Sequence, residues 1–192
     1  MPSHIVVEKE RLVRIDAELW RTSECLLNAG QERERGCTHQ FRASLIFTAF
    51  AFEAYLNHIG PGVFASWPEI ERKLSPHEKL SLLCEQLAVT VDWSSRPWQS
   101  IKALMGYRNT VAHGRGEQLK ESYKENAEHY HRRFYEIPLT DWEEYGSKEN
   151  AERAREDVLK VTELIQAKTG SLDHLPFFPG SLSGSATYVS EG

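Results

Sequence analysis

Residues 43–56, ASLIFTAFAFEAYL, form a segment that is apolar on almost every side. A helix at a protein surface keeps one polar face, so a helix of this composition is expected to lie in the middle of a fold. Glu53 carries the only formal charge in the segment, and a carboxylate in such a place needs a partner. The segment therefore predicts a helical domain built around one central helix that holds one paired acid.

The flanking sequence predicts where this helix begins and ends, and where another one starts. Thr38 is a credible N-cap for the central helix, and Gly60-Pro61-Gly62 predicts its end. Ser75 precedes Pro76 and is followed at the third helical position by Glu78, which is typical of a capping box with proline in the first turn. The other helices are expected from apolar periodicity over residues 6–30, 97–112 and 148–168.

The remaining segments set the domain boundaries. Residues 115–140 are polar, and their pattern leaves an irregular helix and a long loop both open. Residues 169–192 form a Gly/Ser/Pro-rich tail, in which Phe177 and Phe178 are expected to anchor the chain onto the bundle. No strand pattern persists. We therefore predict an all-α antiparallel bundle of about four or five helices, with residues 1–168 as one domain, a polar insertion and an irregular tail.

Composition excludes several classes of protein. The chain has 192 residues and a formal net charge of −5, which argues against a protein that coats nucleic acid nonspecifically. The cysteines, Cys25, Cys37 and Cys84, have long irregular spacings, so we expect buried small side chains in a reducing compartment. Neither a signal peptide nor a membrane span is evident, and the predicted location is cytoplasmic.

A short motif at the expected end of the 97–112 helix carries the functional signal. In RNTVAH, residues 108–113, Arg108 can bind a phosphate, Asn109 can orient an oxygen and His113 can transfer a proton. Gly114 is expected to end the helix in a left-handed conformation. Glu53 is the most economical partner for Arg108, and Asn57 lies four residues after Glu53 on the same helix. Arginine and histidine before a glycine also fit an ordinary helix stop.

The motif RNTVAH resembles the arginine, four-to-six residues, histidine signature of the HEPN superfamily, and FEAYLN, residues 52–57, looks like the central helix of these domains. The resemblance spans roughly residues 7–168 in helix order. It implies a small helical bundle that dimerises with two motifs at a shared cleft, and a metal-independent endoribonuclease that needs no cofactor. Such nucleases include the toxins of toxin–antitoxin pairs, and for a toxin the resemblance implies a cognate antitoxin such as a small nucleotidyltransferase-like protein. Others are noncatalytic nucleotide-binding or protein-interaction modules.

Further residues are candidates for contact with RNA. Residues 96–133 contain eight Lys or Arg against four Glu, a local balance of +4 in an acidic chain. A solvated charged face is the alternative for each of these residues. Cys37 and His39 could supply two metal ligands, but no second pair completes a site. The candidate RNA-binding residues are Arg115, Lys120, His129, His131, Arg132 and Arg133.

Overall fold

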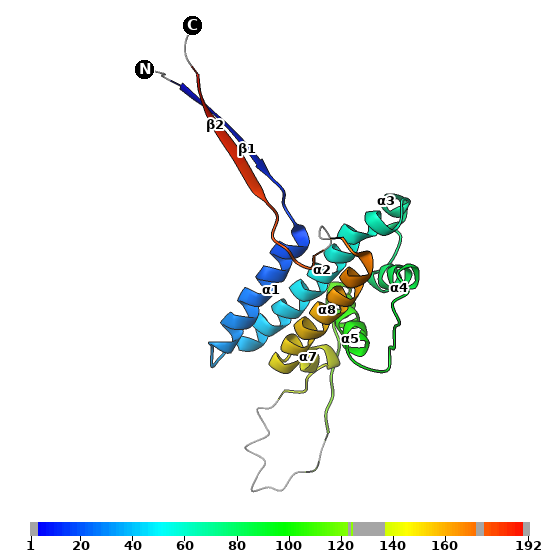
Figure 1. Cartoon of the computed structure of the whole chain (residues 1–192). Coiled ribbons are helices and arrows are strands. Elements are labelled where there is room, and N and C mark those ends of the chain that lie inside the picture. The colour runs from blue at the N-terminus through cyan, green and yellow to red at the C-terminus, as the bar shows by residue number, and fades with distance from the viewer. Residues whose placement is uncertain (1–3, 123, 125–136, 172–174, 190–192) are drawn as a thin grey trace.

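The computed structural model describes residues 4–122, 124, 137–171 and 175–189. This part of the chain is mostly helical and carries one small two-stranded sheet (Figure 1). The described elements, in chain order, are β1 His4–Arg11, α1 Ile15–Gln31, α2 Cys37–Val63, α3 Trp67–Ile70, α4 Pro76–Gln86, α5 Trp98–Ala112, α7 Asp141–Tyr145, α8 Lys148–Thr169 and β2 Leu182–Val189. The helical prediction is thus confirmed in outline, and its all-α form is wrong.

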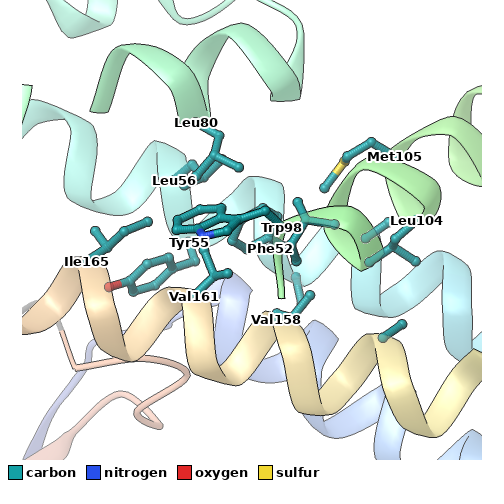
Figure 2. Close-up of a cluster of buried hydrophobic side chains, with 14 of the residues drawn as sticks. Phe52, Tyr55, Leu56, Leu80, Trp98, Leu104, Met105, Val158, Val161 and Ile165 are labelled. Atoms are coloured by element: carbon teal, nitrogen blue, oxygen red, sulfur yellow. The ribbon is translucent and has the colours of Figure 1, made fainter. Parts of the chain in front are cut away.

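Helix α2 lies at the centre of the bundle, where α1, α4, α5 and α8 contact it (Figure 1). Phe52, Tyr55 and Leu56 are fully buried, and Figure 2 shows them among side chains from α4, α5 and α8. Because α2 is covered on several sides, it needs apolar residues around most of its circumference. The prediction of a central apolar helix is confirmed.

The ends of α2 differ from the predicted ones. Gly36, in a left-handed conformation with a φ of 72°, is the N-cap in place of Thr38. Pro61 lies inside the last turn, and the helix continues to Val63. A side chain at Gly60 would place its Cβ 2.1 Å from the ring of the buried Trp67, so this glycine lets the tryptophan close against the helix.

The N-terminal segment is a strand where a helix was expected. Helix α1 begins at Ile15, because residues 4–11 pair in antiparallel register with residues 182–189, from His4 opposite Val189 to Arg11 opposite Leu182. The run Ile5-Val6-Val7 favours extended backbone, since β-branched side chains fit a pleated surface better than a helix. The pairing partner lies at the other end of the chain.

The C-terminal tail is more ordered than expected. Phe177 is buried and stacks on Trp20 of α1 with ring centroids 4.1 Å apart, whereas Phe178 is exposed. The predicted anchor is therefore right for Phe177 and wrong for Phe178. Residues 182–189 form β2, so the tail is not irregular throughout.

Local sequence signals had mixed outcomes elsewhere. The capping box of Ser75 and Glu78 is present at the start of α4. Cys84 is buried, which raises the pKa of its thiol to about 12, but Cys37 is half-buried and Cys25 is exposed.

Within the polar insertion, residues 115–122 contain no helix, and residues 123 and 125–136 lie outside the described residues. No helix of the described chain is both long and apolar enough to cross a membrane.

Candidate active site

Helix α5 places the motif at the edge of the bundle. Ile101, Leu104 and Met105 are buried on the side of α5 that faces the core. Arg108 follows Leu104 by one turn, so its side chain continues this stripe toward α2. The arginine is 24% exposed, which leaves it at the boundary between core and solvent.

Glu53 is the centre of a cluster of three charges. Its Oε2 accepts a hydrogen bond from Arg108 Nη2 at 3.1 Å, and its Oε1 accepts one from Lys79 Nζ at 2.9 Å. The Glu53 side chain is 20% exposed, whereas that of Lys79 is only 5% exposed. The predicted pairing of Glu53 with Arg108 is present, and the two cations leave the cluster with one net positive charge.

Two further contacts fix the Arg108 guanidinium. Its Nη1 donates a hydrogen bond to Asn109 Oδ1 at 3.0 Å, and its central carbon, Cζ, lies 5.5 Å from the centre of the Phe50 ring. An arginine carries five N–H donors, and the hydrogen bonds from Arg108 to Asn109 and to Glu53 use two of them. The guanidinium is therefore held in place and keeps N–H groups for an added anion.

His113 stands at the helix end, as predicted. It is the C-cap of α5, its backbone N–H donates to the Asn109 carbonyl at 3.0 Å, and the residue is exposed. Gly114 is not in the left-handed conformation that we expected. Among the described glycines, positive φ values occur at Gly36 and Gly170. The helix ends at His113 itself, with φ −116° and ψ 14°.

Asn57 does not join this cluster. It lines a hollow of about 370 Å³ together with Val13, Arg14 and Asp16, where the chain passes from β1 into α1. Its Oδ1 is buried without a hydrogen bond in the described part of the protein. The spacing of Glu53 and Asn57 places both residues on one face of an ideal helix, but of these two residues Glu53 alone bonds to Arg108.

The candidate RNA-binding residues divide into two groups. Arg115 and Lys120 are exposed on the segment that follows α5. The others, His129, His131, Arg132 and Arg133, lie outside the described residues. Exposed cations on this segment suit an anionic ligand.

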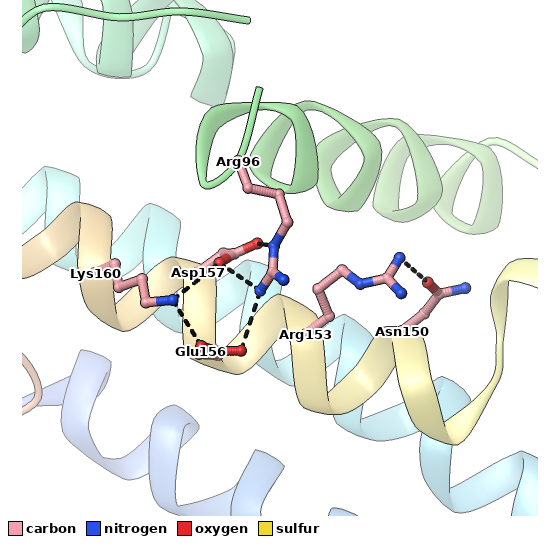
Figure 3. Close-up of polar contacts among 6 residues, drawn as sticks. All are labelled: Arg96, Asn150, Arg153, Glu156, Asp157 and Lys160. Atoms are coloured by element: carbon pink, nitrogen blue, oxygen red, sulfur yellow. Dashed lines mark hydrogen bonds and ion pairs between the residues drawn. The ribbon is translucent and has the colours of Figure 1, made fainter. Parts of the chain in front are cut away.

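Arg96, which contributed to the local positive balance, has a structural role. Figure 3 shows its guanidinium between Asp157 and Glu156 of α8, with Arg96 Nε donating to Asp157 Oδ2 at 2.7 Å. Asp157 is fully buried, and this burial raises its pKa. The hydrogen bonds from Arg96 and Ser100, together with the positive charges of Arg96 and Lys160, outweigh the effect of burial, so the pKa falls below the usual range. Arg96 therefore joins the segment just before α5 to α8 and is not part of a free basic surface.

Lys79 is the site residue that our sequence analysis missed. It lies one position before Leu80 and four before Leu83, on the apolar face of α4. A lysine on the apolar stripe of an amphipathic helix signals either a covered stem or a buried ion pair. The lysine on the apolar face was visible in the sequence. The acid that pairs with it lies on another helix, so it could not be identified from the sequence of α4 alone.

A hollow of about 410 Å³ lies on the other side of α5 from Glu53. Gly106, Tyr107 and Thr110 line it from α5, and Trp142 and Tyr145 line it from α7. The Tyr107 hydroxyl is buried without a described hydrogen-bond partner, and burial raises its pKa.

Comparison of the chain with protein-family models, curated protein sequences and solved structures gave no significant match. The function is therefore inferred from the residues of the chain itself. An oriented guanidinium, an amide and an exposed imidazole at one helix end can bind a phosphodiester and transfer protons beside it.

Proposed function

We propose that this protein is a metal-independent endoribonuclease of the HEPN type. The observation that supports it best is the hydrogen bond between Arg108 and Glu53, which orients the guanidinium at the helix end that carries Asn109 and His113. A guanidinium held in this way loses less conformational entropy when it binds a phosphate. The helical bundle is compatible with the HEPN resemblance of residues 52–57 and 108–113.

The proposed reaction is transesterification within RNA. The ribose 2′-oxygen attacks the adjacent phosphorus while a base accepts the hydroxyl proton, the bond to the 5′-oxygen breaks, and an acid protonates that oxygen. The products are a 2′,3′-cyclic phosphate and a 5′-hydroxyl. Arg108 stabilises the charge on the phosphoryl oxygens, and His113 supplies acid or base catalysis.

We propose that the active form is a homodimer with its two-fold axis near residues 108–113. One chain offers one imidazole at the motif, whereas the reaction needs a base and an acid. Two chains related by two-fold symmetry would supply both, and would double the cations that bind RNA. Mixing Arg108→Ala chains with His113→Ala chains tests this point, since a shared site should regain part of its activity.

The chemistry is tested by incubating the protein with RNA in the presence of a chelator and analysing the new ends. We expect 2′,3′-cyclic phosphate or ends derived from it, and loss of cleavage in both Arg108→Ala and His113→Ala. Arg72→Ala and His39→Ala are matched controls, because both side chains are exposed and neither belongs to the proposed site. Cleavage that requires a divalent metal, or that survives His113→Ala, would refute the mechanism.

The biological setting is proposed on the resemblance alone. We infer a cytoplasmic toxin or defence nuclease that acts on cellular RNA and is neutralised by an antitoxin. A neighbouring reading frame for a small nucleotidyltransferase-like protein would support this setting. Co-purification of that protein with the nuclease, with loss of RNA cleavage in the complex, would test it directly.

A noncatalytic nucleotide-binding or protein-interaction module is the second candidate. The hollow beside α5 favours it, because Tyr107, Trp142 and Tyr145 give aromatic walls of the kind that planar ligands use. In the described part of a single chain, no side-chain hydrogen bond orients the His113 imidazole. Binding of nucleotides with no cleavage of any RNA by wild-type protein would favour this module over the nuclease.

A further inference from the structure

Strands β1 and β2 form a two-stranded ribbon, residues 4–11 and 182–189, which we call the arm. Figure 1 shows the arm extending away from the helices, from the end of the bundle where α1 begins. The large apolar side chains Ile5, Val7, Leu182 and Tyr188 are each more than half exposed. An isolated two-stranded ribbon is marginally stable in water, whereas three or more strands with an apolar face can be stable, so the arm calls for further strands.

The two free edges of the arm differ in charge. Strand β1 carries the run Glu8-Lys9-Glu10-Arg11, and charged side chains on an edge strand oppose pairing with another chain. Strand β2, LSGSATYV, has no charged residue and no proline. The β2 edge therefore lacks the protection that natural edge strands usually carry, whereas the β1 edge has it.

The backbone of β2 also presents a regular set of free groups. The Leu12 N–H donates to the Ser181 carbonyl at 2.8 Å, so the backbone groups of Ser181 point toward the β1 side. Because these groups alternate along an antiparallel strand, those of Leu182, Gly184, Ala186 and Tyr188 point away from β1. They form a row of N–H and C=O groups along the uncharged edge.

Two-fold symmetry then selects an edge and a register. In a symmetric antiparallel pair, facing residues lie on the same side of the sheet, so their numbers have an even sum. For β1, any register centred on residues 8–10 brings Glu8 or Glu10 opposite a glutamate. For β2, the register centred on Ser185 pairs apolar with apolar and polar with polar residues. The facing pairs in that register are Leu182 with Tyr188, Ser183 with Thr187, and Gly184 with Ala186.

We propose that the arms of two copies of this chain pair through β2, with the two-fold axis at Ser185, and form a four-stranded antiparallel sheet. Ile5, Val7, Ala186 and Tyr188 lie on one face of each arm, because Ile5 faces Tyr188 and Val7 faces Ala186. Pairing joins the two apolar faces into one. This interface does not depend on the proposed nuclease activity, because α5 ends beside α7, at the other end of α8 from the arm (Figure 1).

A charge at the symmetry axis tests the proposal. Ser185 faces Glu8 within one arm, so Ser185→Lys adds a favourable pair there but places two lysines opposite each other across the axis. Ser183→Lys is the matched control, because Ser183 faces Glu10 in its own arm and Thr187 in the second copy. We expect the dissociation constant to rise at least about tenfold in Ser185→Lys and to change little in Ser183→Lys.

Sedimentation equilibrium measures the association state of the wild type and of each variant. It detects the loss of arm pairing even if the proposed dimer around residues 108–113 forms as well. Loss of arm pairing reduces a dimer to the monomer or, where the motif dimer forms as well, reduces a larger assembly to that dimer. A wild-type protein that is monomeric at about 100 µM, or a Ser185→Lys variant with unchanged assembly, would overturn the proposal.

Disulfide formation identifies the register itself. In a chain with Cys25 and Cys37 replaced by serine, Ser185→Cys should cross-link two copies on oxidation, because facing residues of a non-hydrogen-bonded pair have Cα atoms about 4.5 Å apart. Ser183→Cys should not, since the two residues 183 would lie about 13 Å apart along the strands. Equal cross-linking at both positions, or none at 185, contradicts the register.

Discussion

Replacing Glu53 by Gln perturbs the charge cluster that orients Arg108. The residue at greatest risk is Lys79, because its side chain is 5% exposed and its hydrogen bond to Glu53 Oε1 is 2.9 Å long. Removing one partner of a buried ion pair costs about 3–5 kcal/mol. Glu53 is 20% exposed, and glutamine can still accept a hydrogen bond, so we expect the free energy of unfolding to fall by about 2 kcal/mol.

A double-mutant cycle separates the ion pair from the packing of the lysine stem. Lys79→Met keeps an apolar stem of similar shape and leaves Glu53 paired with Arg108, so we expect a loss of about 1 kcal/mol or less. In the double variant, Glu53→Gln no longer leaves a buried ammonium unpaired. The double variant should therefore be about as stable as Lys79→Met, which corresponds to a coupling energy of about 2 kcal/mol.

Urea unfolding followed by far-ultraviolet circular dichroism measures these differences. With a typical slope of about 2 kcal/mol per molar, Glu53→Gln should lower the urea midpoint by about 1 M. Arg108→Ala should cost less, because Arg108 is 24% exposed and Lys79 still neutralises Glu53. A coupling below about 0.3 kcal/mol between Glu53 and Lys79, with unchanged slopes, would refute the view that this cluster is held by charge pairing.

The remaining predictions concern stability. Gly60→Ala should destabilise the protein by about 1–3 kcal/mol, because its Cβ would lie 2.1 Å from the Trp67 ring, and thermal unfolding measures the loss. Gly106→Ala, on α5 with nothing within 4 Å of the added Cβ, should instead stabilise it by about 0.5–1 kcal/mol; a loss there would contradict the open hollow. For Asp157, the pKa is lowered in the folded protein, so its stabilisation is fully present above the ordinary value of 3.8 and is lost as pH falls through the lowered folded-state value. Arg96→Met should weaken the dependence of the urea midpoint on pH in that acidic range. If the midpoint of the variant changes with pH as steeply as that of the wild type, a group other than Asp157 causes the loss of stability in acid.

The elements that the sequence predicted well are those specified by neighbouring residues. The capping box at Ser75 and the apolar segment around Phe52 use side chains within one or two turns, so a single helix carries the whole signal. The pairing of Glu53 with Arg108 was also predictable, because one charge in an apolar helix requires a partner and one arginine stood at a marked helix end.

Several site features were predictable only in part. Lys79 showed an anomaly on the apolar face of α4, but which acid it meets depends on how α4 packs against α2. Asn57 shares a face with Glu53 along a straight helix, yet α2 has different neighbours one turn later, and Asn57 meets the start of α1. Arg96 looked like part of a basic surface and is held by the buried Asp157.

By itself, the sequence determined the helical class, the central helix and the residues available at the end of α5, because periodicity, caps and isolated charges are local properties. Tertiary structure decided which of those residues meet. It also decided the fold of both chain ends: Ile5-Val6-Val7 and the serine-rich stretch around Ser185 each carry a weak strand preference, and they become strands because the bundle brings residues 4–11 beside residues 182–189. Pairing between such distant segments has no local sequence signal, since its hydrogen bonds are made by backbone groups that every residue carries.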